Sequence, residues 1–116
     1  MPSSKAARLQ DIIDNSQAIF RYTEGMELVN FEEHRLVYDA VERCLERICE
    51  TVVKLGEQAR LLMPDQPWYK FRAFGNVLRV RRHRRRQAFD IVRNDLPSLC
   101  AAAASALQSF PESDAQ

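Results

Sequence analysis

Hydrophobic residues recur at intervals of three and four along most of the chain, which is the spacing of one face of an α-helix. The first such series lies within residues 4–23, and its face carries Leu9, Ile12, Ile13, Ser16 and Phe20. A longer series runs from about residue 33 to residue 62, through Val37, Val41, Cys44, Ile48, Val52, Leu55, Ala59 and Leu62. The pattern therefore predicts two helices joined by a short connection, "MELVNFEEH", over residues 26–34.

Glycine and proline mark the ends of these two segments. Gly25 follows the first series, where a glycine commonly ends a helix. Gly56 falls inside the second series, where it costs about 1 kcal/mol relative to alanine, so we expect a close contact with another helix there. Pro64 and Pro67 end the long helix. Its charged residues are expected to face the solvent: Glu42, Arg43, Glu46, Arg47 and Glu50.

The second half of the chain is also helical in pattern. Residues 68–78 predict a third helix, and residues 87–110 continue with an apolar face made of Phe89, Val92, Leu96, Leu99, Ala103, Leu107 and Phe110. Pro97 either kinks this last helix or starts a second one with Asp95 as its N-cap. Helices with short connections predict an all-α fold, an antiparallel four- to five-helix bundle. We expect one domain over residues 1–110 and a frayed tail over residues 111–116.

Composition is that of a soluble globular protein, with 46% hydrophobic and 28% charged residues in 116 positions. No segment is long and apolar enough to cross a membrane, and the N-terminus lacks a secretory signal, so we expect a cytoplasmic protein without membrane contact. The three cysteines have no paired spacing and are expected to be free thiols. No cluster has metal-ligand spacing and no glycine-rich loop is present, so neither a metal nor a cofactor is expected.

The charge of the chain is concentrated in one stretch, "RVRRHRRRQ", at residues 79–87. The net charge of the whole chain is +1, and it becomes −5 if the six arginines of this stretch are removed. Such a group attracts RNA phosphates, and Trp68, Tyr69 and Phe71 just upstream are candidates for stacking on bases. The alternatives are a solvated run of charge and aromatic residues that belong to the core.

Four segments together resemble the HepT-like ribonucleases of the HEPN superfamily. They are "RLQDIIDNSQAIFRYTEGM", "DAVERCLERICETVVKL", "PWYKFRAFGNVLR" and "FDIVRNDLPSLCAAAASAL", in the order in which relatives carry similar text. The resemblance implies a HEPN-like bundle and the ribonuclease toxin of a bacterial toxin–antitoxin pair. It further implies a homodimer that cleaves RNA without a metal, and a minimal nucleotidyltransferase antitoxin as its partner.

The family's active site pairs an arginine with a histidine at the end of the third helix. Here the candidates for catalysis are Arg79, as the group that stabilises the phosphate, and His83, as the acid or base. The candidate RNA-binding residues are Arg72, Asn76, Arg81, Arg82, Arg84, Arg85 and Arg86. The second histidine, His34, is expected to be a solvated surface residue.

The sequence of this chain differs from that of the family at the active site itself. Val80 stands where relatives have the histidine, Gly75 stands where many have the arginine, and no tyrosine follows His83. One possible set of codons for residues 79–87, read with the frame shifted by one base, encodes an amino-acid sequence similar to that of the family. A pair of compensating frameshifts is therefore one hypothesis for the origin of the arginines. Two alternatives to a ribonuclease stay open. One is an inactive helical dimer that binds RNA or a nucleotidyltransferase, and the other is a helical scaffold with an accidental basic loop.

A dimer is expected to use apolar surface near the third and last helices. The reason is a set of aromatic residues that exceeds what the centre of one small bundle needs: Trp68, Phe71, Phe74, Phe89 and Phe110.

Overall fold

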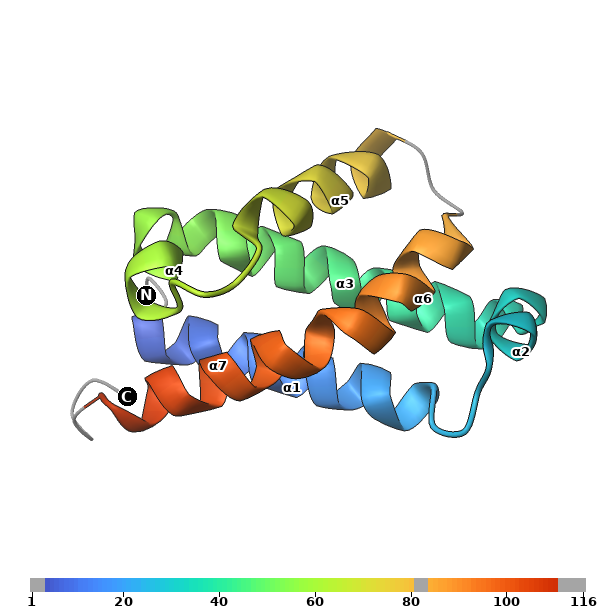
Figure 1. Ribbon diagram of the computed structural model, residues 1–116, viewed down its shortest axis with the longest axis horizontal. Helices are drawn as coiled ribbons and strands as arrows, with labels where there is room; N and C mark the ends of the chain where they lie inside the picture. Colours follow the sequence, from blue (N-terminus) through green and yellow to red (C-terminus); the bar gives the residue numbers. More distant parts are fainter. Residues whose placement is uncertain (1–3, 81–83, 111–116) are drawn as a thin grey trace.

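The structure is a computed structural model that describes residues 4–80 and 84–110, without the side chains of residues 79 and 80. All regular structure in these ranges is helical (Figure 1). The helices are α1 (Lys5–Tyr22), α2 (Leu28–Glu33), α3 (Arg35–Leu55), α4 (Glu57–Leu62), α5 (Trp68–Val80), α6 (Arg85–Asn94) and α7 (Leu96–Gln108). The predicted all-α class is confirmed.

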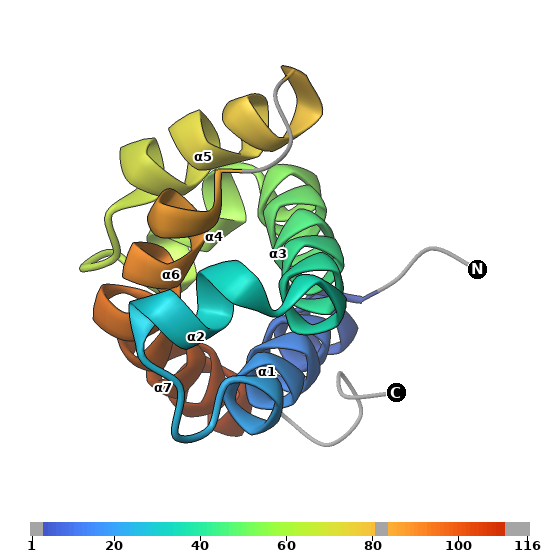
Figure 2. The same ribbon diagram turned by 90° about the vertical axis from the view of Figure 1, so that its right-hand side faces the viewer.

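Four of these helices, with at least 13 residues each, form the bundle: α1, α3, α5 and α7. Each runs antiparallel to the neighbour on which it packs, α1 against α3 and α7, and α3 against α5 (Figure 1). Figure 2 shows α1 and α5 on opposite sides of α3. No helix within the described ranges has the length and apolar character needed to cross a bilayer. The expected tail over residues 111–116 lies outside the described residues.

Helix α1 follows the sequence pattern closely. The Ser4 hydroxyl accepts a hydrogen bond from the Ala7 amide at 3.0 Å and so caps the helix, which ends at Tyr22. Gly25 has a φ of +76°, a conformation that glycine adopts at little cost. The residues of the predicted face are buried except Phe20, which is half-buried.

The predicted single helix from residue 33 to residue 62 is wrong, because the chain breaks at Gly56. This residue has φ +57° and ψ −131°. Glycine adopts this backbone conformation at a much lower energetic cost than other residues do. The expected close helix contact is also wrong: a Cβ atom on Gly56 would meet nothing nearer than the Val53 carbonyl oxygen at 3.9 Å. Gly56 is therefore required by its backbone conformation, which turns α3 into α4.

The connection predicted over residues 26–34 contains a helix, α2, and this is a second difference. The Glu27 amide donates a hydrogen bond to the Asn30 side chain at 2.9 Å at its start. Phe31 is fully buried, and its ring centroid lies 5.8 Å from that of Tyr38 and 5.2 Å from that of Phe89. One aromatic side chain thus fixes α2 between α3 and α6.

The aromatic residues expected at a dimer interface belong to the core of the single chain. Trp68, Phe71, Phe74 and Phe89 are all buried, and Phe110 is partly buried against the same core. The argument for a dimer from surplus aromatic residues is therefore wrong. Tyr69 differs from its neighbours on α5, with 78% of its surface exposed.

At Pro97 the second alternative is correct, since α7 begins at Leu96 as a new helix. Asp95 occupies the N-cap position, but its side chain makes no capping hydrogen bond. Its carboxylate instead lies 2.8 Å from the Lys70 ammonium group, and Gln66 donates to the Ser98 hydroxyl at 3.0 Å. These two contacts tie the start of α5 to the start of α7.

Candidate nucleic-acid interface

The residues proposed from the sequence gather where α5 ends and α6 begins, and we call residues 79–86 the α5–α6 junction. Arg79 is in the last turn of α5, and Arg84 is the residue before the first turn of α6. Arg85 and Arg86 are the first two residues of α6. The candidates Arg81, Arg82 and His83 lie outside the described residues.

A line of exposed residues on α5 leads to this junction. Tyr69, Arg72 and Asn76 are exposed and, with Arg79, follow one another at intervals of three, four and three. This spacing places the four positions on one face of a helix. We call them the α5 stripe. Of the three aromatic residues considered for base stacking, Trp68 and Phe71 are buried and only Tyr69 is accessible to a ligand.

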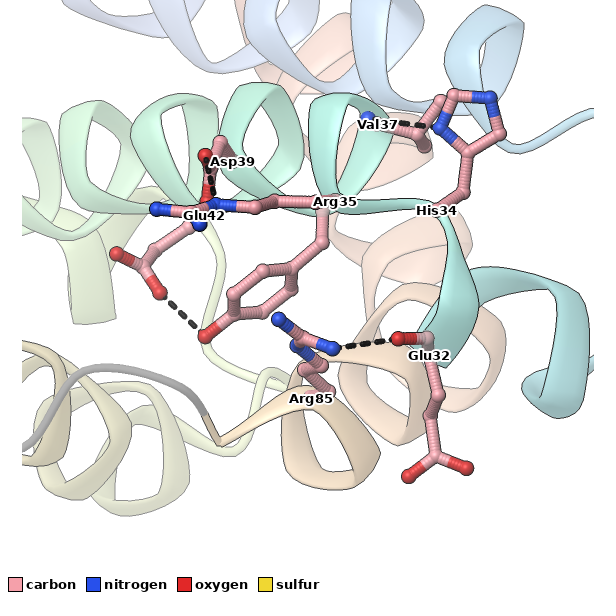
Figure 3. Close-up of polar contacts among 8 residues, drawn as sticks. Glu32, His34, Arg35, Val37, Asp39, Glu42 and Arg85 are labelled. Atoms are coloured by element: carbon pink, nitrogen blue, oxygen red, sulfur yellow. Dashed lines mark hydrogen bonds and ion pairs between the residues drawn. The ribbon is translucent and has the colours of Figure 1, made fainter.

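The three described arginines at the start of α6 differ in their surroundings. Arg84 and Arg86 are exposed, whereas Arg85 is half-buried. One terminal nitrogen of Arg85 donates to the Glu32 carbonyl oxygen at 2.5 Å, as Figure 3 shows. Its guanidinium carbon lies 4.7 Å from the centre of the Tyr38 ring, in a cation–π arrangement. Arg85 therefore joins α6 to α2 and α3.

Beneath Arg85 lies a buried polar pair on α3. The Tyr38 hydroxyl donates to a carboxylate oxygen of Glu42 at 2.5 Å (Figure 3). Tyr38 is fully buried and Glu42 is 5% exposed, so the expectation that Glu42 faces solvent is wrong. The spacing of four residues, with a tyrosine on the apolar side of the helix, is the sequence signal that points to this pair.

A groove of about 770 Å³ separates α3 from α5 on the side of the α5 stripe. Its apolar wall includes Val52, Val53, Ala59, Trp68, Phe71 and Leu78, and its polar lining includes Glu46, Glu50, Lys54, Arg60, Arg72 and Asn76. The two helices are in close contact at Gly75, where a Cβ atom would lie 3.3 Å from the Cys49 Cβ atom. Gly75 is thus a contact glycine, the role that had been expected at Gly56.

The three cysteines are free thiols, as predicted. Burial raises the pKa of the Cys44 thiol, an effect that the nearby Arg47 and Arg43 oppose. Burial also raises the pKa of the Cys100 thiol, and a hydrogen bond with Ser16 lowers that pKa by a smaller amount. A raised pKa keeps a thiol protonated and makes it a poor nucleophile.

His34 is exposed, as predicted, and its Nδ1 atom accepts a long hydrogen bond of 3.4 Å from the Val37 amide at the start of α3. Across residues 4–80 and 84–110, no group of three or more histidine, cysteine and acidic side chains could hold a metal ion. The described side chains of the junction and the α5 stripe supply guanidinium, amide and phenol groups.

The chain matches the protein-family model described as ribonuclease HepT-like over residues 12–106. This range contains the whole α5 stripe, the α5–α6 junction and the groove. No curated protein and no solved structure matches the chain.

Proposed function

Because the chain belongs to the HepT-like ribonuclease family, we propose that it is a toxin that cleaves RNA at the α5–α6 junction. The reaction assigned to it is endonucleolytic cleavage carried out by arginine and histidine side chains, with no metal ion taking part. The RNA follows the α5 stripe and reaches the junction at Arg79.

The observation that carries this proposal is the arrangement of exposed groups on both sides of the junction. The stripe presents an aromatic ring at Tyr69 and a guanidinium at Arg72, about two helical turns before Arg79. Exposed arginines at positions 84 and 86 follow on the other side. A single strand of RNA is bound by this combination, because its bases stack on an aromatic side chain and its phosphates pair with arginines.

The proposed roles at the reacting atoms follow from side-chain chemistry. His83 takes the proton from a ribose 2′-hydroxyl, whose oxygen then attacks the adjacent phosphorus, and a protonated group returns a proton to the leaving 5′-oxygen. Arg79 stabilises the negative charge that develops on the phosphoryl oxygens. Arg85 holds the start of α6 in place from below, through Glu32 and Tyr38.

The proposal includes two protein partners. The family as a whole works with antitoxins and dimerises, so we assign this chain a second copy of itself and a minimal nucleotidyltransferase antitoxin. We also assign its action to the cytoplasm, where RNA is available as a substrate.

A second candidate function is an inactive member that binds RNA or the antitoxin without cleaving. Gly75 favours it, because relatives commonly carry an arginine there and this chain has a close contact with Cys49 instead. An arginine at this position would have to push α5 away from α3 by a few tenths of an ångström. The site therefore depends on Arg79 for the charge that Gly75 does not supply.

Cleavage of a 5′-labelled single-stranded RNA in buffer with EDTA tests the proposal. We expect fragments with the wild-type chain, and none with His83→Ala or Arg79→Ala. His34→Ala and Arg21→Ala are matched controls outside the junction and retain cleavage. RNA retained at low salt but left intact by the wild-type chain would support the inactive alternative. If the wild-type chain neither binds nor cleaves RNA, the ribonuclease proposal is contradicted, and so is the RNA-binding form of the inactive alternative.

A further inference from the structure

We propose that the groove between α3 and α5 is a base-selecting subsite, which takes one guanine nucleotide of the RNA that follows the α5 stripe. Glu50 receives the edge of the guanine base, and the cations at the α4 end of the groove receive its phosphate. The inference rests on the proposed function, because it names a feature of the RNA that this site selects.

The groove has the size and the lining of a site for a small organic ligand. Its volume of about 770 Å³ lies within the roughly 300–1,000 Å³ that such sites occupy. Val53 lines it from α3 and is 68% exposed, so the chain by itself leaves apolar surface of this wall in water. Trp68 and Phe71 line it from α5. A flat aromatic base placed against this wall covers apolar surface and is stabilised by doing so.

Four exposed, charged side chains that line the groove form no ion pair with any residue that the structure describes. They are the cations Lys54, Arg60 and Arg72 and the carboxylate of Glu50. The other carboxylate of the lining, that of Glu46, lies 3.2 Å from the Arg43 guanidinium. The unpaired lining therefore has a net positive charge and one acceptor, which favours an anionic ligand that donates hydrogen bonds.

The cations and the carboxylate lie at different levels of the groove. Because α3 and α5 run antiparallel and are in contact at Cys49 and Gly75, positions after Cys49 lie level with positions before Gly75. Lys54 and Arg72 are therefore at the same end of the groove, toward α4. Glu50 lies one turn of α3, about 6 Å, nearer the α5–α6 junction. A nucleotide has its phosphate and the edge of its base at opposite ends, and so matches this order.

Guanine is the base whose edge fits a single carboxylate best. Its Watson–Crick edge presents two adjacent donors, N1–H and the 2-amino group, and the two oxygens of a carboxylate accept both at once. Adenine and cytosine each present one amino group beside an acceptor nitrogen. Uracil presents its single N–H between two carbonyl oxygens, which a carboxylate repels. A base subsite at Glu50 therefore selects guanine and discriminates most strongly against uracil.

Arg72 connects this subsite to the rest of the RNA path, because it belongs both to the α5 stripe and to the lining of the groove. A strand held along the stripe can turn one base into the groove beside this arginine, since the bases of a single strand are not held by pairing. Glu46 and Glu50 repel phosphates from the end of the groove nearer the junction. That end is thus occupied by a base and not by the backbone.

The fluorescence of Trp68, the single tryptophan of the chain, reports on the groove that it lines. Titration of the full chain with guanosine monophosphate should change this fluorescence in a saturable way. Uridine monophosphate should bind roughly tenfold more weakly. Inosine monophosphate, which lacks only the 2-amino group, should lie between the two. Guanosine without a phosphate should bind more weakly than guanosine monophosphate, because it leaves the cations of the groove without an anion.

Glu50→Gln should reduce the preference for guanosine over uridine monophosphate to roughly twofold or less, because an amide presents only one acceptor oxygen, beside a donor. Arg60→Ala, which lies off the α5 stripe, should weaken both nucleotides alike. Glu24→Gln and Arg21→Ala are matched controls, since both residues are exposed and neither lines the groove. Both should keep the wild-type affinities, and circular dichroism should report equal helix content throughout.

Three results with the mononucleotides would overturn the proposal. They are the absence of any fluorescence response in the wild type, equal affinity of the wild type for the guanine and uracil nucleotides, and a Glu50→Gln variant that keeps the wild-type preference.

Two oligonucleotides carry the test to RNA, a uridine oligomer and the same oligomer with one guanosine. The second should bind more tightly, and Glu50→Gln should remove the difference. A preference seen with mononucleotides alone would overturn the assignment of the groove to RNA. Cleavage of both oligomers with equal affinity would overturn the subsite and leave the proposed function standing. A preference for guanosine in a chain that cleaves neither oligomer would support the subsite and contradict the ribonuclease proposal.

Discussion

The Tyr38 hydroxyl lies 2.5 Å from a carboxylate oxygen of Glu42, and the Arg85 guanidinium covers the same tyrosine ring. This relationship joins α3, at the floor of the α5–α6 junction, to the first turn of α6. A residue of the arginine-rich segment is thus part of the fold, while its neighbours Arg84 and Arg86 remain exposed.

Tyr38→Phe should lower the free energy of unfolding by about 1–2 kcal/mol, because it removes a buried hydrogen bond to a carboxylate and keeps the ring. Urea denaturation followed by circular dichroism measures the difference. Tyr69→Phe is the matched control, since that hydroxyl is on an exposed side chain, and its effect should stay within about 0.5 kcal/mol. Equal losses from the two variants would show that the Tyr38–Glu42 bond contributes nothing.

Arg85→Ala should mainly lower stability, whereas Arg86→Ala should mainly weaken RNA binding. Removing Arg85 deletes the contacts with Glu32 and Tyr38 and should cost about 1–2 kcal/mol of unfolding free energy. Removing Arg86 should change stability by less than about 0.5 kcal/mol but weaken RNA binding. Chemical denaturation and a binding titration on each variant separate the two roles. A stable Arg85→Ala protein with weakened RNA binding would reverse the assignment.

Stability should fall as the pH rises above the ordinary thiol pKa of 9.0, because burial raises the pKa of Cys44 and of Cys100 in the folded chain. Below that pH both states hold the proton. Between the unfolded and folded values the unfolded state releases it first, so unfolding is favoured. Urea midpoints from pH 8 to pH 10 measure the decline, which Cys44→Val should reduce. An identical slope in wild type and variant would exclude Cys44 as a source.

The sequence predicts the first helix well, because its apolar spacing and Gly25 both act locally. It does not predict the break at Gly56, since apolar residues continue across this position at helical spacing. That spacing carries no information about the sign of φ at one glycine. Helix α2 was also missed, because its six residues are too short for periodicity and Phe31 is held by Tyr38 and Phe89 from other helices.

For the interface, the sequence identifies the charged segment but not the separate roles of its arginines. Arg85 differs from Arg84 and Arg86 only because its side chain reaches Glu32, 53 positions earlier. Likewise, Tyr69 is exposed whereas Trp68 and Phe71 are buried in the core. Such long-range relationships require the assembled fold.

A set of variants isolates the proposed electrostatic contact between RNA and the junction. One variant replaces Arg81, Arg84 and Arg86 with serine and keeps Arg85, whose contacts support the fold. The control replaces three arginines elsewhere with serine: Arg21, Arg35 and Arg47. His83→Ala is a further control, because a neutral imidazole releases no counterion on binding.

The salt dependence of single-stranded RNA binding tests the central claim most directly, that the α5–α6 junction holds RNA by its phosphates. If about four arginines engage phosphates, the logarithm of affinity should fall against the logarithm of salt concentration with a slope of roughly −3. The junction variant should flatten this slope and bind all RNA sequences more weakly, while both controls should keep it. Binding that is indifferent to salt, or a junction variant with the wild-type slope, would contradict the claim.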